Sequence, residues 1–350
     1  MLSRSAAIRA FMVLVFVLAT GLAFAGPLDH TVYGKLHVSL NGFTNSEEYG
    51  TSLTSNATYL GLAGSYRIRE GFAVIGQLEV QVNTARQEYS LGTARNSYVG
   101  LRGTYGTFLA GIHDTPLKTL GRKMTYFEDT IGDFRSTTMQ VDRRLDEILI
   151  YELPALKSGL GGQVSYRLDQ SDWTDPEAEH ASAFSAMLFF APDDFLLGFA
   201  YQSTAAGYFN PEPEETGAES VFRGVGQFET ESFGVSALFQ GIDGFGGVEN
   251  LFAVTFGFEG MVMPSPRWRF KGSYYSTDPN TDLDDDRYTQ LALGIDHPLD
   301  AVTFYLQYAV MMNDDNRKAG LGNNDWGDVV LPSDLGKSAS GISLGLWWIF

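Results

Sequence analysis

Apolar residues occupy every second position in segment after segment of this 350-residue chain. Between Phe72 and Asn83, for example, phenylalanine, valine and leucine share one set of alternate positions, while glutamine, glutamate and asparagine share the other. Successive side chains of a β-strand point to opposite faces, so each such segment has one apolar and one polar face. No strong helical period competes with this pattern. The sequence therefore predicts an all-β protein.

The connections between the alternating segments differ in length, which separates a membrane barrel from a soluble sandwich. Short turns such as Arg69–Gly71 and Tyr105–Gly106 join some neighbouring segments, whereas long polar connections join others. Many aromatic residues, including Tyr33 and Tyr274, fall near the expected strand ends. Transmembrane barrels have short turns at one end, long loops at the other and aromatic girdles at both interfaces. We therefore expect an antiparallel up-and-down transmembrane β-barrel.

The alternation predicts sixteen strands. They cover residues 31–41, 57–68, 72–83, 95–104, 107–113, 143–153, 160–169, 181–191, 195–204, 221–229, 232–241, 250–262, 267–276, 287–297, 301–312 and 339–350. Residues 221–241 could instead form one long strand. We expect two strands there, because bacterial barrels with both ends on one side have an even number of strands. A barrel of this size encloses an aqueous channel.

The first 25 residues have the pattern of a cleaved export signal. Arg4 and Arg9 are followed by the apolar run Phe11–Leu18 and by Ala23–Ala25, which fits the small-residue cleavage rule. A membrane anchor is the alternative, but the run is shorter than the roughly 20 residues that a spanning helix needs. We expect removal of residues 1–25, which leaves residues 26–350 as a single barrel domain of the bacterial outer membrane.

The last strand ends on an aromatic residue. Leu346, Trp348 and Phe350 lie on one face, and small residues such as Ser343 alternate with the apolar set. This ending resembles the terminal signature by which outer-membrane proteins are passed to their assembly machinery. We therefore expect these three residues to act as an assembly signal.

Several segments resemble the general trimeric porins of proteobacteria. Thr31–Leu36 is similar to their first strand, Arg95–Leu101 to their fourth, and Tyr105–Thr107 with His113–Pro116 to their fifth. The resemblance implies a homotrimer of sixteen-stranded barrels, each narrowed by an inward-folded third loop. It also implies passive diffusion of ions and small hydrophilic solutes, with membrane lipid and lipopolysaccharide as surroundings.

The sequence departs from this family after the first loop. Tyr59 and Ala63 stand where a basic residue is usual. At these two positions, the basic residues that usually line the channel wall in this family are therefore in doubt.

The connection over residues 114–142 differs chemically from the other loops, because it mixes charges with aromatic residues. Its basic residues include Arg122, Lys123 and Arg135. We expect this loop to fold into the barrel, with Glu128, Asp129 and Asp133 as an acidic edge of the constriction. An ordinary outer loop with solvated charges is the alternative.

Strand parity predicts which charged side chains of the wall face the lumen. A lysine or arginine on the lipid face costs about 2–4 kcal/mol at the membrane midplane. The expected lumen-facing residues are Lys35, Arg67, Glu79, Arg102, Arg167, Arg269 and Lys271. Arg67 and Arg102 lie close to turns, which places them near the periplasmic mouth. Bases on the wall facing acids on the loop would create a transverse field in the channel.

The charge balance excludes some partners. The net charge of −18 makes nucleic acid an improbable partner, because phosphate binding needs a basic surface. The same acidity favours a weak preference for cations. The chain contains no cysteine, so it has neither disulfides nor thiolate sites.

Enzymatic and metal functions have little support in the sequence. The five histidines have no metal-ligand spacing, and no local serine or histidine motif indicates a nucleophile with its base. The acidic run Thr281–Asp286 could hold a divalent cation, but a solvated loop tip fits better because a calcium loop's glycine and closing glutamate are absent. We therefore expect no enzyme, cofactor or metal. A substrate-selective channel and a plugged structural or adhesion barrel remain the alternatives to a diffusion channel.

Overall fold

The computed structural model describes residues 28–86, 91–139, 141–154, 156–168, 182–204, 218–245, 248, 251–280, 282–323 and 328–350. The expected export signal at residues 1–25 lies outside the described residues, as does Thr281 of the acidic run. Within the described part of the chain, no helix has both the length and the apolar character required to cross a membrane.

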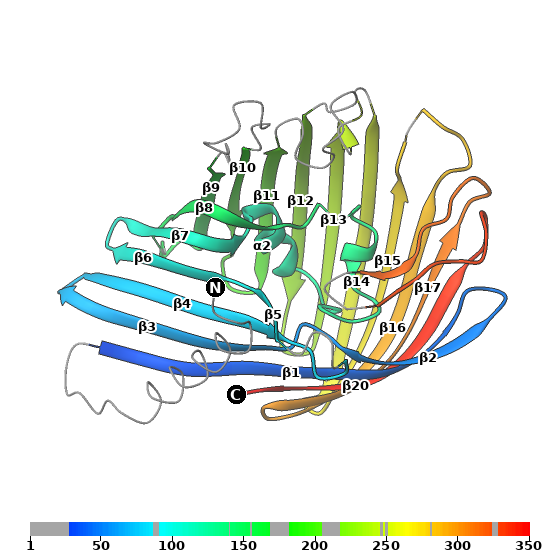
Figure 1. Cartoon of the computed structure of the whole chain (residues 1–350), viewed down its shortest axis with the longest axis horizontal. Helices are drawn as coiled ribbons and strands as arrows, with labels where there is room; N and C mark the ends of the chain where they lie inside the picture. Colours follow the sequence, from blue (N-terminus) through cyan, green and yellow to red (C-terminus); the bar gives the residue numbers. More distant parts are fainter. Residues whose placement is uncertain are drawn as a thin grey trace, which may run out of the picture.

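Strand segments form one antiparallel sheet that closes where β1 (Leu28–Thr44) pairs with β20 (Ala339–Ile349). The segments between them are β2 (Tyr49–Ser55), β3 (Tyr59–Arg69), β4 (Phe72–Val82), β5 (Leu91–Ala94), β6 (Ser97–Gly103), β7 (Gly106–Asp114), β8 (Arg144–Glu152), β9 (Leu160–Arg167), β10 (Ala183–Phe190), β11 (Phe195–Thr204), β12 (Glu219–Glu229), β13 (Phe233–Asp243), β14 (Phe252–Ser265), β15 (Trp268–Asp278), β16 (Tyr288–Leu299) and β17 (Val302–Asn313). Together they form the wall of the barrel (Figure 1).

Two strands of this wall are interrupted. Both β2 and β3 pair with β1, and both β5 and β6 pair with β4. Each of these pairs is therefore one strand with a break, and the eighteen segments of the described sheet form sixteen wall strands. β12 and β13 pair in antiparallel register over ten positions, from Ser220 with Asp243 to Glu229 with Gly234. This confirms the split of residues 221–241 into two strands.

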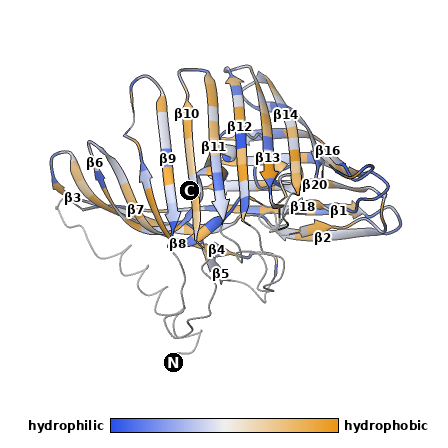
Figure 2. Ribbon diagram, turned by 90° about the horizontal axis from the view of Figure 1, so that it is seen from above, coloured by the Kyte–Doolittle hydropathy of each residue, from blue (hydrophilic) through white to orange (hydrophobic). Residues whose placement is uncertain are grey.

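Hydrophobic and hydrophilic residues alternate along the strands of the barrel (Figure 2), and many of the large hydrophobic residues are exposed. In β4, Leu78 is half-exposed, whereas its neighbour Glu79 is buried on the inner face. In β20, Ile342 and Leu344 are exposed on either side of the fully buried Ser343. A soluble sandwich has the opposite arrangement, so the exterior of this barrel is suited to lipid.

The connection between β7 and β8 folds back into the barrel. We call residues 115–143 the constriction loop. The helix α2 (Pro116–Arg122) lies inside the barrel against β10, β11 and β12 (Figure 1). Thr115 caps this helix, because its hydroxyl accepts a hydrogen bond from the Lys118 amide, and Pro116 suits the first helical position. A 3-10 turn, η2 (Phe134–Ser136), follows later in the loop.

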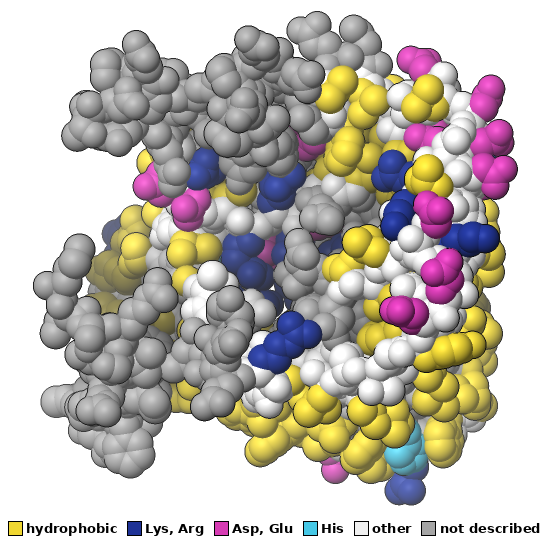
Figure 3. All heavy atoms as spheres, turned by 45° about the vertical axis from the view of Figure 1, so that its right-hand side comes forward, with side chains coloured by type: hydrophobic (Ala, Val, Ile, Leu, Met, Phe, Trp, Pro, Cys, Tyr) yellow, Lys and Arg dark blue, Asp and Glu magenta, His cyan; other side chains and the backbone are white. Residues whose placement is uncertain are grey.

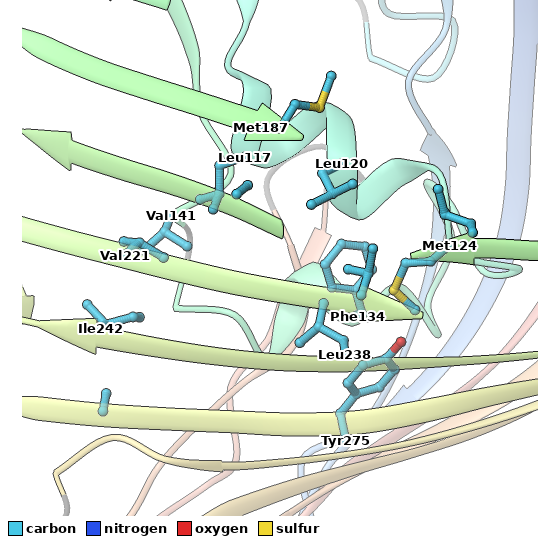
Figure 4. Packing of buried hydrophobic residues seen from close by; sticks show 14 residues of the cluster. Leu117, Leu120, Met124, Phe134, Val141, Met187, Val221, Leu238, Ile242 and Tyr275 are labelled. Atoms are coloured by element: carbon cyan, nitrogen blue, oxygen red, sulfur yellow. The ribbon is translucent and has the colours of Figure 1, made fainter. Parts of the chain in front are cut away.

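The constriction loop packs on the wall through a dry apolar core. Leu117, Leu120, Met124 and Phe134 of the loop are fully buried (Figure 4). The wall residues around them come from β10 to β15 and face inward: Met187, Leu196, Ala200, Val221, Val225, Leu238, Ile242, Ala253 and Tyr275. The aqueous channel expected from the size of the barrel therefore does not extend over the inner face of this part of the wall.

A second apolar cluster fixes the middle of the constriction loop. Phe127 and Ile131 are fully buried against inward-facing residues such as Ala309. Leu321, from the small hairpin β18 (Leu321–Asn323) and β19 (Asp328–Val330), belongs to the same cluster. A long connection after β17 thus also reaches inward, and it contacts η2.

Candidate functional site

Glu259 of β14 anchors the middle of the constriction loop to the wall. Its carboxylate is buried and accepts hydrogen bonds from the Thr125 hydroxyl at 2.8 Å and the Tyr126 amide at 2.5 Å. The Tyr275 hydroxyl donates a third bond at 2.7 Å. Three donors around one carboxylate satisfy most of its lone pairs, which makes its burial tolerable.

Arg223 of β12 anchors the end of the constriction loop. Its Nη1 lies 2.6 Å from Oδ1 of Asp142, and its Nη2 lies 2.9 Å from Oδ2, so the pair is bidentate. Arg223 also donates to the Leu117 carbonyl at 3.1 Å, which joins both ends of the loop. Burial tends to raise the pKa of Asp142, but Arg223 outweighs burial and lowers it.

Three cations surround Asp114 at the start of the constriction loop. Its Oδ1 lies 3.4 Å from Nζ of Lys118 and 3.0 Å from Nε of Arg144, and its Oδ2 lies 3.2 Å from Nη1 of Arg122. Arg122 also binds Glu128, so two carboxylates face three positive charges. This cluster therefore leaves positive charge at the point where the loop enters the lumen.

The three acids of the constriction loop have different surroundings. Asp133 is fully buried, caps η2 and binds Arg135, so its charge is used inside the loop. Asp129 is also buried, 2.8 Å from Nη2 of Arg135 and 3.0 Å from Nζ of Lys35. Glu128 binds Arg122, and its side chain is 32% exposed. Of the three, Glu128 is the acid that reaches water.

The same surroundings separate the acidities of the two neighbouring acids. Burial tends to raise the pKa of Asp129, but Lys35 and Arg135 outweigh it and hold the pKa well below its usual value. Burial and the adjacent Asp129 raise the pKa of Glu128. Asp129 therefore stays ionised over a wide pH range, whereas Glu128 takes up a proton more readily than an ordinary glutamate.

The wall opposite the apolar core carries a second charged group. Nε of Arg95 lies 2.7 Å from Oε1 of Glu79, and the Tyr33 hydroxyl donates to Oε2 of Glu79 at 3.0 Å. The guanidinium of Arg95 lies 4.9 Å from the centre of the Tyr59 ring. Tyr59 stands where the sequence resemblance leads to the expectation of a basic residue, and here Arg95, between β5 and β6 on the far side of β4, supplies a base instead. We call Tyr33, Lys35, Tyr59, Glu79 and Arg95 the pore wall.

Three other basic residues that were expected to face the lumen lie outside the pore wall. Lys271 is buried, 3.0 Å from Asp296, and donates to the Tyr126 carbonyl at 2.7 Å, while Arg269 lies 3.7 Å from Asp296. Both line a 310 Å³ pocket on the short-turn side of the constriction loop, together with Lys123. Arg167 binds Asp146.

Arg67 and Arg102 are exposed in the strand segments next to turns, as their sequence positions suggested. The structure does not bring either residue to the constriction.

Water-accessible charge at the constriction is mainly basic. Arg122 is 30% exposed, Lys123 is exposed, and Arg144 and Lys35 are partly exposed. The acids Asp114, Asp129 and Asp133 are buried beneath them, which leaves Glu128 as the main accessible acid of the group. Figure 3 shows Lys and Arg side chains (dark blue) gathered around the hollow in the middle of one face.

The sequence did not identify Arg95, Asp114, Arg144, Arg223 or Glu259 as residues of the site. Arg223 and Glu259 carried a usable signal, because each is a charged residue within an alternating strand and so has to face inward. Among the described residues, no group of three or more histidine, aspartate and glutamate side chains is placed to hold a metal ion.

The chain is similar in sequence to known outer-membrane proteins. The model of the family described as Gram-negative porin matches residues 10–316. The major outer membrane protein P.IB of Neisseria gonorrhoeae is 24% identical over 181 residues, which are 48% of this chain and 51% of that protein. P.IB of Neisseria meningitidis serogroup A is 23% identical over 240 residues, 66% of each chain. The chain thus spans about half to two thirds of the length of these curated relatives.

Solved structures share the fold at low sequence identity. The anion-selective porin from Comamonas acidovorans superposes with a TM-score of 0.74 at 17% identity, covering 92% of this chain and all of that one. OmpT of Vibrio cholerae, in its trimer form, gives a TM-score of 0.68 at 15% identity and covers 92% of this chain and 99% of that one. The similarity extends over almost the whole chain.

Proposed function

Because the chain belongs to the Gram-negative porin family, we propose that it forms a water-filled channel in the bacterial outer membrane for passive diffusion of ions and small hydrophilic solutes. The observation that carries this proposal is the closed barrel with a lipid-suited exterior and an inner face that bears charged residues. The constriction loop fills one side of the lumen, so solutes pass between it and the pore wall.

The charges at the narrow part favour a weak preference for anions. The net charge of the chain favours cations, but charge in outer loops is screened beyond about 8 Å at physiological salt. The charges that a passing ion meets are those of Arg122, Lys123, Arg144 and Lys35, against Glu128. The structural relative from Comamonas acidovorans is described as anion-selective, which supports the same direction. This proposal differs from the weak cation preference that the composition suggested.

The residues of the constriction have distinct roles in this proposal. Arg122 and Glu128 form the water-facing edge of the loop, and the pore wall forms the opposite edge. Asp129 and Asp133 hold the loop in shape through Arg135 rather than forming an acidic rim. Long loops face the outside of the cell and short turns face the periplasm, as is general for bacterial barrels.

We also propose that the barrel works as a homotrimer embedded in outer-membrane lipid. The support is a structural relative, OmpT of Vibrio cholerae, that is described in a trimer form. Gel mobility of the folded protein before and after boiling tests this directly.

The purified protein in a planar bilayer tests the channel itself. We expect stepwise, ohmic conductance in KCl. In a KCl gradient, the sign of the reversal potential should show that chloride permeates better than potassium. A silent bilayer would instead favour a plugged barrel, since the apolar core already fills one side of the lumen. A reversal potential on the cation side would reject the selectivity while leaving the channel intact.

A further inference from the structure

A second pocket lies on the long-loop side of the constriction loop. It has a volume of about 470 Å³ and is lined by residues of the constriction loop, of the wall and of the connection after β17. We call it the vestibule pocket. Its volume falls within the range of about 300–1,000 Å³ that is usual for small-molecule sites.

The side of the vestibule pocket formed by the connection after β17 is held in place. Leu321 of β18 is fully buried in the apolar cluster of Phe127 and Ile131. The Asn313 side chain accepts from the Ala319 amide at 2.7 Å and donates to the Ala319 carbonyl at 3.1 Å. Val329 and Leu331 project from this fixed segment into the pocket lining. The pocket therefore has a built wall on this side.

The lining carries an excess of positive charge. Arg135, Arg143 and Arg317 line the vestibule pocket, and Glu219 is the acid of the lining. Arg135 binds Asp129 and Asp133 inside the loop. Arg317 differs, because it forms no ion pair within 4.0 Å among the described residues, although the charge of Asp286 interacts with it from farther away, and its Nε is buried without a hydrogen-bond partner in the described part of the chain. A guanidinium in this position needs an anionic or other acceptor group.

Apolar and aromatic surface lies beside this charge. The Arg317 guanidinium lies over the Tyr288 ring, 5.1 Å from its centre, which is within the range of a cation–π contact. Met139, Phe245, Val329 and Leu331 complete the apolar part of the lining. A small inorganic anion would use only the arginine, whereas a solute with both a carboxylate and an apolar group would use both parts.

We propose that the vestibule pocket binds small organic anions that carry an apolar group, with Arg317 as the carboxylate-binding residue and Leu331 on the apolar side. This site concentrates such solutes on the outer side of the constriction before they cross. The inference rests on the proposed channel function for its role, but the binding itself does not require conduction.

Benzoate, acetate and benzylammonium are suitable probes, because they separate charge from apolar surface. With the full chain in a planar bilayer, we expect benzoate added on the long-loop side to reduce the KCl current at concentrations about tenfold lower than acetate. Benzylammonium should have no such effect. Equal effects of benzoate and acetate would overturn the proposal, and so would equal effects of benzoate and benzylammonium.

Amino-acid substitutions test which residues of the vestibule pocket bind benzoate. Arg317→Gln should raise the half-blocking benzoate concentration about tenfold, as expected for loss of a charged hydrogen bond. Lys318→Gln removes the same charge from the next residue, which does not line the pocket, and should leave that concentration unchanged. Leu331→Asn should reduce the difference between the half-blocking concentrations of benzoate and acetate. Equal shifts for Arg317→Gln and Lys318→Gln would mean a general field effect and would contradict the site.

Calorimetric titration of the detergent-solubilised protein with benzoate separates the two proposals. If the bilayer is silent in plain KCl, the channel function fails, and saturable heat that Arg317→Gln removes still supports the vestibule pocket. If KCl conducts normally but benzoate gives neither block nor saturable heat, the vestibule pocket is rejected and the channel stands.

Discussion

The two sides of the lumen have the same strand geometry and opposite chemistry. On the pore wall, inward-facing positions carry Lys35, Glu79 and their partners. On the strands from β10 to β15, which we call the loop-bearing wall, inward positions such as Val225 and Leu238 are apolar and bury the constriction loop. The alternation therefore determines whether a side chain points inward or outward. The constriction loop determines whether an inward-pointing side chain contacts water.

The charged residues follow the same division. On the loop-bearing wall, Arg223 and Glu259 are completely buried and each holds a segment of the loop. At the pore edge, Arg122 and Glu128 keep about a third of their side-chain surface exposed. We therefore expect changes on the loop-bearing wall to alter stability and changes at the pore edge to alter selectivity.

The largest effect should come from Arg223→Met. It leaves Asp142 charged and buried without its partner, a situation that typically costs about 3–5 kcal/mol. We expect a lower urea midpoint of unfolding and altered conductance, since the loop loses its end anchor. Arg287→Met is the matched control, because Arg287 pairs with Asp278 at the exposed surface and should cost less than about 1 kcal/mol. Equal losses in the two variants would contradict the division between the walls.

A smaller loss of stability should follow from Leu120→Ala. Leu120 is fully buried between the loop and the loop-bearing wall, and such truncations cost about 2–5 kcal/mol depending on how far the cavity collapses. The urea midpoint measures this loss. The exposed Leu78→Ala of β4 is the control, and its midpoint should barely change in detergent. An unchanged urea midpoint for Leu120→Ala would mean that apolar contacts do not hold the loop in place.

Changes at the pore edge should shift selectivity with little loss of stability. A unit charge 4 Å away is worth about 1 kcal/mol in water, with opposite signs for an anion and a cation, so Arg122→Gln should lower the anion-to-cation permeability ratio by up to about thirtyfold. Glu128→Gln should raise the same ratio. Reversal potentials in a KCl gradient measure both variants. Shifts in the same direction would show that the two side chains do not face the ion path as a pair.

The smallest effect concerns pH. Because the pKa of Glu128 is raised by burial and by Asp129, Glu128 becomes neutral as the pH falls through values above those of an ordinary glutamate. Asp129 has a lowered pKa and stays ionised, so the loop keeps its shape. Anion preference should therefore increase on mild acidification, and Glu128→Gln should remove this dependence. A pH response that persists in the variant would assign it to another group.

Much of the fold was accessible from the sequence, because one face of every strand has to suit lipid. The approximate strand positions and the outward direction of residues such as Leu78 followed from the period of two, and the two strands within 221–241 followed from the even number of strands in bacterial barrels. Parity also gave the inward direction of Lys35 and Lys271.

The candidate site was less accessible, because alternation carries no information on what meets an inward side chain. Asp133 is neutralised by Arg135 through the fold of one loop, which no strand pattern encodes. Arg95 lies in the break between β5 and β6, where the period is interrupted. In β12, glycines at the lipid-facing positions 224 and 226 weaken the contrast with the inward valines. In none of these three cases does the strand alternation indicate what the side chain contacts.

Cysteine accessibility tests the division of the lumen most directly, because the natural chain contains no cysteine. Gln77 of β4 and Val225 of β12 both face inward, and Gln77 is partly exposed whereas Val225 is buried beneath the loop. We predict that a charged, water-soluble thiol reagent modifies Gln77→Cys rapidly and Val225→Cys hardly at all in the folded protein. Equal rates of modification at the two positions would contradict a lumen with one wet and one dry wall.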